Sequence, residues 1–176
     1  MENAEEQIVC QKRIADCILL EDSSLEDKKK RITPLWNKAV ESCWANMESV
    51  PSCAFYLRLL YADKARLHLG FSMNGFHPDP TSASDLREAE QCIQTLEKPN
   101  LKTETGATYT DAFRLICKSK IAFDQSKLTG FETEAERRKM EALSLYDEAA
   151  VICETANNNS VLFLLSSLKE IGRAHV

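Results

Sequence analysis

The chain has 176 residues, of which 44% are hydrophobic and 28% charged, and a formal net charge of −5. This composition is typical of one soluble globular domain, and the mild acidity argues against extensive binding of nucleic acid. No apolar run approaches the roughly 20 residues that span a bilayer. Only five glycines and five prolines occur, so we expect few, long elements and favour helices over many short strands.

The N-terminal stretch, MENAEEQIVCQKR, is acidic and lacks the apolar core of a signal peptide, which predicts a cytoplasmic protein. The seven cysteines agree with this prediction, because their number is odd and no C-x-x-C pair occurs. We expect them to be small, buried hydrophobic residues in a reducing compartment. A zinc site or a redox switch is the alternative.

Seven helices are predicted from apolar residues that recur at helical spacing, and no strand is predicted. In chain order the helices cover residues 4–20, 25–47, 52–73, 85–98, 107–128, 132–156 and 160–170. The first helix is recognised by an apolar stripe of Ile8, Cys10, Ile14, Cys17 and Ile18. The stretch 74–83, rich in glycine, proline and serine, is predicted to be a loop.

Capping residues indicate where three of these helices begin. Ser24, with Asp27 three residues later, resembles a capping box for the second helix. Thr133 and Glu136 form a similar box for the sixth helix, and Ser84 is expected to cap the fourth.

Proline and glycine predict interruptions in the helices. Pro34 lies inside the second helix, where we expect either a kink or a restart with Thr33 as the cap. The tripeptides NGF at 74–76 and TGF at 129–131 are expected to close the third and fifth helices.

The even-numbered helices share a pattern that indicates an internal repeat. Their leading alanines are Ala39, Ala89 and Ala142, which lie 50 and 53 residues apart. A larger residue follows four positions later on the same face, and the alanine lets a neighbouring helix approach closely. A helix pair of this kind cannot bury its apolar face alone, so consecutive pairs are expected to stack.

One copy of this pattern resembles a known family. Ala142, Tyr146 and Ala149 match A-x3-F/Y-x2-A, the pattern of the second helix of a tetratricopeptide repeat. The copy that begins at Ala39 and is followed by Pro51 has the same spacing with different residue types. The unit here is about 50–55 residues long against 34 in the family, and the W-x2-L-G-x2-Y signature is missing.

The resemblance covers residues 4–156 and implies an all-α fold. Antiparallel helix pairs would stack as a right-handed tetratricopeptide-like solenoid of about seven helices, within a single domain at 1–170. The alternative is a non-repetitive antiparallel helical bundle. Such long helices and insertions are tolerated in the interferon-induced tetratricopeptide proteins, which bind RNA in a basic internal channel. The similarity to that subfamily is one of architecture only.

No recognised catalytic or ligand-binding motif occurs in the sequence. The three histidines, His68, His77 and His175, cannot be combined into a metal site or a base–nucleophile pair by their spacing. No Walker loop, G-x-S-x-G or H-E-x-x-H motif occurs. Trp36 and Trp44 are eight residues apart and share a helix face, which favours a core position. We therefore expect no enzymatic activity, no cofactor, no metal and no small-molecule substrate.

The distribution of charge is the feature that indicates a partner. The helices at 52–73 and 107–128 carry net positive charge, while those at 85–98 and 132–156 are net negative. In a tetratricopeptide array the first helix of each pair lines the concave groove, so the resemblance implies a basic groove. A basic groove favours an acidic peptide, a C-terminal carboxylate or a phosphate backbone.

The sequence therefore predicts a non-catalytic scaffold that binds an acidic segment of another protein, without a membrane. RNA binding is the alternative function, and a solvated surface that binds nothing is the alternative role of these charges. The candidate partner-binding residues are Arg58, Lys64, Arg66, Arg114, Lys118 and Lys120.

The last residues suggest that a longer protein has been cut. The segment 160–170 resembles the first helix of a fourth pair, and no second helix follows it. The hexapeptide IGRAHV at 171–176 resembles one translated frame of a widely used sequencing-library adapter. We therefore expect the native sequence to end near Glu170, with 171–176 as a non-native tail on the N-terminal piece of a helical-repeat protein.

Overall fold

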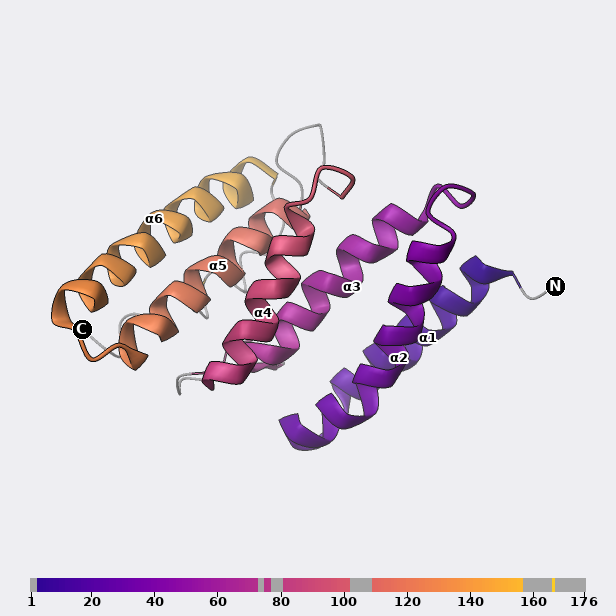
Figure 1. Cartoon of the computed structure of the whole chain (residues 1–176), viewed down its shortest axis with the longest axis horizontal. Helices are drawn as coiled ribbons and strands as arrows, with labels where there is room; N and C mark the ends of the chain where they lie inside the picture. Colours follow the sequence, from indigo (N-terminus) through magenta and orange to yellow (C-terminus); the bar gives the residue numbers. More distant parts are fainter. Residues whose placement is uncertain (1–2, 73–74, 77–80, 102–108, 157–165, 167–176) are drawn as a thin grey trace.

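A computed structural model gives the fold and describes residues 3–72, 75–76, 81–101, 109–156 and 166 (Figure 1). The helices are α1 (Ala4–Leu20), α2 (Leu25–Ala45), α3 (Cys53–His68), α4 (Ala83–Leu96), α5 (Tyr109–Leu128) and α6 (Glu132–Ala156). These confirm the all-α class in the described part of the chain. Of the predicted seventh helix only Ser166 is described, in helical conformation, and the tail at 171–176 lies outside the described residues.

Of the three caps that the sequence predicts, one is confirmed and two are corrected. Ser24 accepts a hydrogen bond from the backbone N–H of Asp27 at 3.2 Å, which confirms the predicted cap of α2. The cap of α4 is Ser82 rather than Ser84, because Ser82 has the extended backbone that lets its hydroxyl accept from the N–H three residues on. The sixth helix already begins at Glu132, so Thr133 lies within its first turn.

The second helix continues through Pro34, so the predicted restart at this residue is wrong. Proline has no N–H, and the carbonyl of Lys30 therefore lacks its usual intrahelical donor. Thr33 does not act as a cap. Its hydroxyl donates to the carbonyl of Lys29 at 2.6 Å, as a threonine in a helix interior does.

The third helix ends at His68, earlier than predicted, because Gly70 adopts a φ of 72°. This left-handed conformation reverses the chain and terminates a helix. The strands β1 (Phe71–Ser72) and β2 (Gly75–Phe76) then pair antiparallel. Gly75 and Phe76 of the NGF tripeptide therefore belong to this short pairing and do not close α3, whereas residue 74 lies outside the described residues. The expectation of no strand is corrected here.

Consecutive helices pack side by side along the chain (Figure 1). Helix α1 packs against α2, α3 against α4, and α5 against α6. The odd-numbered helices also meet one another, since α1 contacts α3 and α3 contacts α5. The odd helices thus form a continuous row through the molecule.

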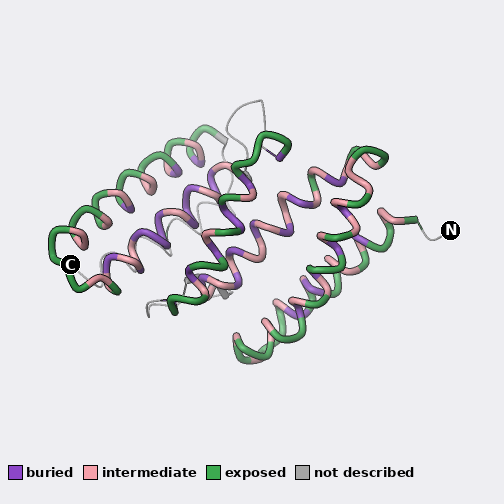
Figure 2. The backbone as a smooth tube through the Cα atoms, in the orientation of Figure 1, coloured by how far each residue is buried: buried purple, intermediate pink, exposed green. Residues whose placement is uncertain are grey.

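Two hydrophobic clusters make up the core, and α3 contributes to both. Leu57 and Leu60 belong to the cluster built with α1 and α2, whereas Ala62 and Ala65 belong to the one built with α4, α5 and α6. Tyr61 packs against both clusters. The burial pattern agrees, with buried positions recurring along α3 and α5 and exposed ones concentrated on α6 (Figure 2).

The alanines of the repeat pattern occupy the buried helix contacts that the pattern predicts. Ala39 and Ala89 are fully buried, and Ala142 is 5% exposed. Trp36 is also buried, which confirms its predicted core position. Trp44 is partly buried, and its indole N–H donates to the hydroxyl of Tyr61 at 3.3 Å.

The prediction that every cysteine is buried is wrong for two of the seven. Cys10 and Cys17 are exposed, and both lie on α1. The other five are buried free thiols: Cys43, Cys53, Cys92, Cys117 and Cys153. The surface of α1 therefore carries two solvent-exposed thiols.

Candidate functional site

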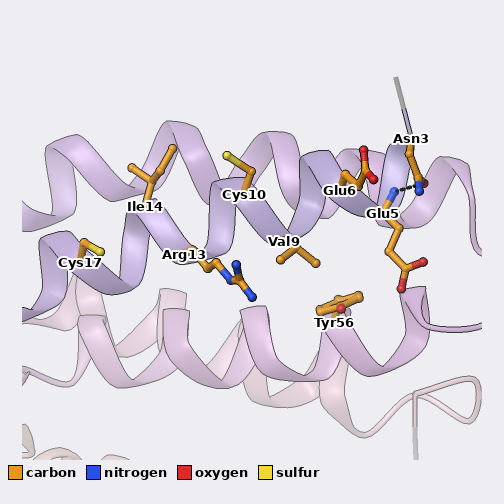
Figure 3. A pocket seen from close by; sticks show the side chains of 9 residues that line it. All are labelled: Asn3, Glu5, Glu6, Val9, Cys10, Arg13, Ile14, Cys17 and Tyr56. Atoms are coloured by element: carbon orange, nitrogen blue, oxygen red, sulfur yellow. Dashed lines mark hydrogen bonds between the residues drawn. The ribbon is translucent and has the colours of Figure 1, made fainter. Parts of the chain in front are cut away.

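A groove of about 510 Å³ runs along α1 where this helix passes α3 (Figure 3). Its lining combines apolar groups, thiols and charges. From α1 come Glu5, Glu6, Val9, Cys10, Arg13, Ile14 and Cys17. Tyr56 of α3 lines the opposite side. The groove lies on the row of odd-numbered helices, which the sequence analysis predicts to be the partner-binding surface.

Helix α1 can line a groove because its apolar residues occupy two faces rather than one stripe. Ile8 and Ile18 are buried. Cys10 points away from the core, because the two residues from Ile8 turn the side chain by about 200° around the helix axis. Ile14 lies about 120° from Ile8 and about 40° from Ile18, at the edge of the buried face. Ile14 is consequently 45% exposed. An exposed aliphatic beside two exposed thiols is a surface that a partner could cover.

Polar contacts hold α1 against α3 beneath the groove. Ser52 donates its hydroxyl to the carboxylate of Glu5 at 2.7 Å. Lys12 pairs with Asp16 at 2.8 Å and with Asp63 at 3.4 Å. The Ser52–Glu5 and Lys12–Asp63 contacts join the two helices, whereas Lys12–Asp16 lies within α1.

The carboxylate of Asp63 is in an environment that disfavours its charge. Burial raises the pKa of Asp63 above its ordinary value, although Arg66 and Lys12 act in the opposite direction. For Lys12, burial lowers the pKa, but Asp63 and Asp16 outweigh it and the pKa is raised. The charges of Lys12, Asp16, Asp63 and Arg66 therefore neutralise one another at the contact between α1 and α3. None of them is available to a ligand.

Arg13 is the cation that the groove itself presents. Its side chain extends from α1 toward α3 (Figure 3). It is exposed and makes no ion pair with any residue in the described part of the chain. An unpaired guanidinium next to Val9 and Tyr56 can bind a carboxylate while the apolar groups bind an aliphatic or aromatic side chain.

Of the six cations predicted from the sequence, Lys120 is placed in the interior and this prediction is corrected. Its side chain is 0% exposed and contacts both carboxylate oxygens of Asp124 at 2.6 Å. Thr81 donates to the same carboxylate through its hydroxyl at 2.7 Å and its N–H at 3.2 Å. Burial lowers the pKa of Lys120, while Asp124 raises it in part. Lys120 is therefore a structural residue.

Arg114 and Lys118 both form ion pairs with a carboxylate at the end of the neighbouring helix α4. They lie 2.7 and 2.9 Å from the same oxygen of Glu97, at the end of α4. Burial raises the pKa of Glu97, but the two cations outweigh it and hold the pKa below its ordinary value. Opposite net charges on adjacent helices thus neutralise each other by pairing.

The remaining three candidate cations lie on α3 and make contacts different from those of Arg114, Lys118 and Lys120. Lys64 is 4.0 Å from Glu88 of α4. Arg66 pairs with Asp63 at 3.3 Å and stacks over the ring of Phe113, 5.5 Å from its centroid. Arg58 is half-buried and makes no ion pair within the described chain. Arg114 and Lys118 therefore serve contacts with α4, Lys120 is paired within α5, and the three cations of α3 do not converge with them on one groove.

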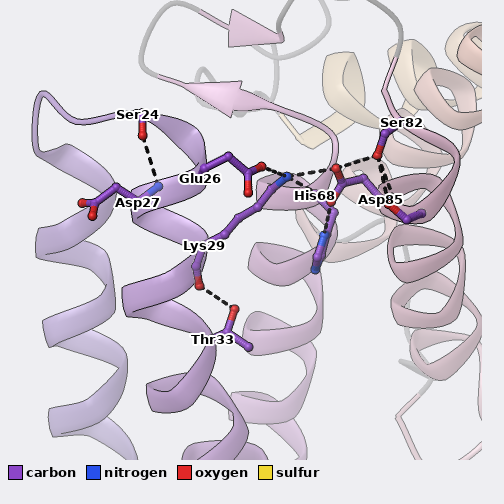
Figure 4. A network of polar contacts seen from close by, with 9 residues as sticks. Ser24, Glu26, Asp27, Lys29, Thr33, His68, Ser82 and Asp85 are labelled. Carbon is purple, nitrogen blue, oxygen red and sulfur yellow. Dashed lines mark hydrogen bonds and ion pairs between the residues drawn. The ribbon is translucent and has the colours of Figure 1, made fainter.

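His68, which the sequence could not assign, takes part in a polar network that joins three helices (Figure 4). Its Nδ1 lies 2.7 Å from the carboxylate of Asp85. Lys29 of α2 donates to that carboxylate at 2.9 Å, and Ser82 donates at 2.8 Å. Burial raises the pKa of Asp85, but the hydrogen bonds outweigh it and the pKa lies below its ordinary value.

This depressed pKa predicts an acid-dependent loss of stability. The pKa of Asp85 is near 3.9 in the unfolded chain and lower in the folded one. At pH values above 3.9 the ionised carboxylate contributes its full stabilisation, and this contribution is lost as the pH falls through the pKa of the folded state. Urea unfolding at pH 7 and pH 3 should show Asp85→Asn less stable than wild type at pH 7, with the difference shrinking at pH 3. A difference of equal size at both pH values would contradict this role of the carboxylate.

No family model matches the chain, and no curated protein or solved structure is significantly similar to it. Within the described residues, no group of three His, Cys, Asp or Glu side chains could hold a metal ion. None of the described helices is both long and apolar enough to cross a membrane. The assignment of function therefore depends on the groove and on the way the helices pack.

Proposed function

We propose that this chain is a non-catalytic, cytoplasmic helical-repeat scaffold that binds a segment of another protein in the groove between α1 and α3. The single observation that carries this proposal is the groove itself. It exposes Ile14 and two thiols on a helix whose opposite face is buried. Beside them lies Arg13, for which the described residues provide no ion pair. Such a surface is typical of interaction sites.

The proposal includes a tetratricopeptide-like arrangement of antiparallel pairs in a right-handed array. Three features support it: consecutive helices pack pairwise, the odd helices form a row, and the repeat alanines are buried. In such an array the row of odd helices forms the concave surface. The groove along α1 would then be the first part of that surface.

The chemistry of the lining specifies the partner more closely than the sequence did. Val9, Ile14 and Tyr56 supply an apolar contact area, Arg13 supplies a positive charge, and Glu5 and Glu6 at the N-terminal end of α1 supply negative ones. We propose a segment with apolar anchors flanked by a carboxylate, so that burial of apolar surface provides affinity and the carboxylate provides orientation. A strongly acidic segment would find few free cations, because the cations named above are mostly paired.

RNA is the less favoured ligand for the same reason. Affinity for a phosphate backbone grows with the number of cations that are free to displace counterions. Lys64, Arg66, Arg114, Lys118 and Lys120 each have a carboxylate partner in the structure. Binding to phosphates would require these ion pairs, within and between helices, to break.

The groove predicts which substitution abolishes binding. Peptides selected by phage display against the purified chain should combine aliphatic or aromatic residues with an acidic one. Fluorescence polarisation should show their affinity weakened at least about tenfold by Ile14→Asp, which corresponds to about 1.4 kcal/mol. The aspartate is expected to disrupt apolar contact while leaving stability nearly unchanged, since Ile14 is exposed.

Leu143→Asp is the matched control. Leu143 is an aliphatic residue on α6 with 58% exposure, comparable with that of Ile14, but it does not line the groove. Peptide affinity should be unchanged in this variant, and circular dichroism should show both variants folded. Equal affinities of wild type and Ile14→Asp for every selected peptide would sink the proposed site.

A further inference from the structure

Two exposed thiols lie on one face of α1, in the groove between α1 and α3 (Figure 3). Cys10 and Cys17 are seven residues apart, so their side chains leave the helix within about 20° of each other, two turns apart. The other five cysteines are buried free thiols. A reagent dissolved in water therefore reaches Cys10 and Cys17 without any opening of the fold.

The geometry of the helix excludes a disulfide between these two thiols. Seven residues of α-helix rise about 10 Å along the axis, whereas the Cα atoms of a disulfide are at most about 7 Å apart. Oxidation of the folded chain must therefore join Cys10 and Cys17 each to a separate molecule.

Arg13 favours anionic molecules among those that could react. It follows Cys10 by three residues and precedes Cys17 by four, and residues at these spacings are neighbours on a helix surface. Arg13 is exposed and has no ion pair in the part of the chain that the structure describes. Its guanidinium can therefore pair with a carboxylate of an adduct on either thiol.

Cys17 is the more favourable of the two positions for an anionic adduct. The carboxylate of Glu6 also lines the groove, four residues before Cys10, and it repels a negatively charged group there. Near Cys17, by contrast, Asp16 and Glu21 each already pair with a cation of the chain. The arrangement of charges therefore directs an anionic adduct first to Cys17.

We propose that Cys17, and after it Cys10, are sites of glutathionylation that blocks the groove, an inference that rests on the function proposed above for the same groove. The thiolate of the cysteine attacks one sulfur of glutathione disulfide. A bond forms between these two sulfurs, and the disulfide bond of the reagent breaks. One glutathione leaves as a thiolate and takes up the proton that the cysteine lost, so the cysteine is oxidised and the leaving half is reduced.

The adduct competes with the partner for the same surface. A glutathionyl group has two carboxylates, and one of them pairs with Arg13, as the carboxylate of the partner is proposed to do. The rest of this tripeptide covers the apolar lining beside the thiols, which includes Ile14. Exchange with a free thiol removes the adduct, so the block is reversible.

Tryptic peptides locate the modification. Trypsin cleaves after Lys12, Arg13 and Lys28, so peptide 1–12 contains Cys10 and peptide 14–28 contains Cys17, each as its only cysteine. The folded chain is incubated with glutathione disulfide, unfolded in N-ethylmaleimide to block free thiols, and digested. We expect glutathione on 14–28 first and on 1–12 later, with maleimide on the five buried cysteines. Glutathione on the buried cysteines at the same rate would refute the proposed sites.

Arg13→Gln tests whether the groove recognises the reagent. Glutathione disulfide is anionic and the disulfide of 2-mercaptoethanol is neutral, so the ratio of their rates at Cys17 reports the effect of charge, while a change in the thiol itself affects both rates equally. We expect Arg13→Gln to lower this ratio about twofold or more. Arg137→Gln on α6 removes the same charge outside the groove and should leave the ratio unchanged. Equal ratios in wild type and Arg13→Gln would exclude recognition by Arg13.

Peptide binding separates this inference from the proposed function. Glutathionylation should weaken the affinity for peptides selected against the reduced chain at least about tenfold in fluorescence polarisation, and dithiothreitol should restore it. The double variant Cys10→Ser and Cys17→Ser should bind as the reduced wild type does and should not respond to glutathione disulfide. A reduced chain that binds no selected peptide would refute the proposed function, whereas equal affinities of the reduced and glutathionylated chains would refute the inference of glutathionylation alone.

Discussion

Replacing Asp124 with asparagine is expected to destabilise the chain by about 3–5 kcal/mol, because the ammonium of Lys120 then lies buried without a counter-charge. Both side chains are 0% exposed, so water cannot replace the lost carboxylate. The amide still provides an acceptor for Thr81, which confines the change to the charge. Urea unfolding at pH 7 measures the loss.

The pH dependence of this loss identifies its cause. Burial lowers the pKa of Lys120, and removal of Asp124 takes away the group that raises it. The unfolded chain therefore binds a proton that the folded variant binds poorly, and stability of Asp124→Asn should rise with pH toward the ordinary lysine pKa of about 10.4. A loss that does not change with pH would indicate a packing defect instead of a buried charge.

Two further variants serve as controls for the buried pair. Lys120→Met combined with Asp124→Leu should recover only part of the lost stability. An apolar pair of similar size requires no counter-charge, but the hydroxyl and N–H of Thr81 then lack their acceptor. On the surface, Glu136 pairs with Lys139 at 2.7 Å. Glu136→Gln removes an exposed ion pair and should cost less than about 1 kcal/mol. If Asp124→Asn is no more costly than Glu136→Gln, the buried pair does not stabilise the fold as argued.

Trp36→Ala should cost about 3–5 kcal/mol, through lost burial and the cavity left in the cluster that α1, α2 and α3 share. Trp36 is 1% exposed and is among the largest buried side chains in the described structure. Since its helix contacts both α1 and α3, the cavity would weaken the first pair and its junction with the next. Thermal and urea unfolding followed by circular dichroism measure the effect.

A phenylalanine at the same position tests whether shape or polarity dominates. The indole N–H of Trp36 is buried and has no hydrogen-bond partner in the described part of the chain. Trp36→Phe removes that unsatisfied donor, which offsets part of the packing loss by about 1–3 kcal/mol. We expect this variant to be clearly more stable than Trp36→Ala. Equal losses in the two variants would show that Trp36 acts through contacts a phenyl ring cannot replace.

Local residue patterns were sufficient to predict most of the helices. The predicted first helix at 4–20 coincides with α1, and Ser24 caps α2 as predicted. The alanines of the repeat pattern are buried because spacing on a helix places them on one face. These predictions succeed because hydrogen bonding and side-chain periodicity within a helix depend on residues that are close in the sequence.

The candidate site could be predicted only in part, because it depends on contacts between helices. The apolar residues of the first helix were read as one stripe, whereas only those facing the core are buried. A count of angles around the axis would have separated Ile8 from Cys10 and Ile14. Arg13 was missed because the comparison of charges began with the third helix. Which of two apolar faces stays open depends on where neighbouring helices pack.

The sequence by itself determined the helical class, most helix positions and the small residues at helix contacts. Tertiary structure decided which charges are free. Net charge along a helix predicted a basic surface, but Glu97 neutralises Arg114 and Lys118, and Asp124 neutralises Lys120. The physical reason is that Coulomb attraction and the cost of burying a charge depend on distance and exposure in space, which residue order along one helix does not specify.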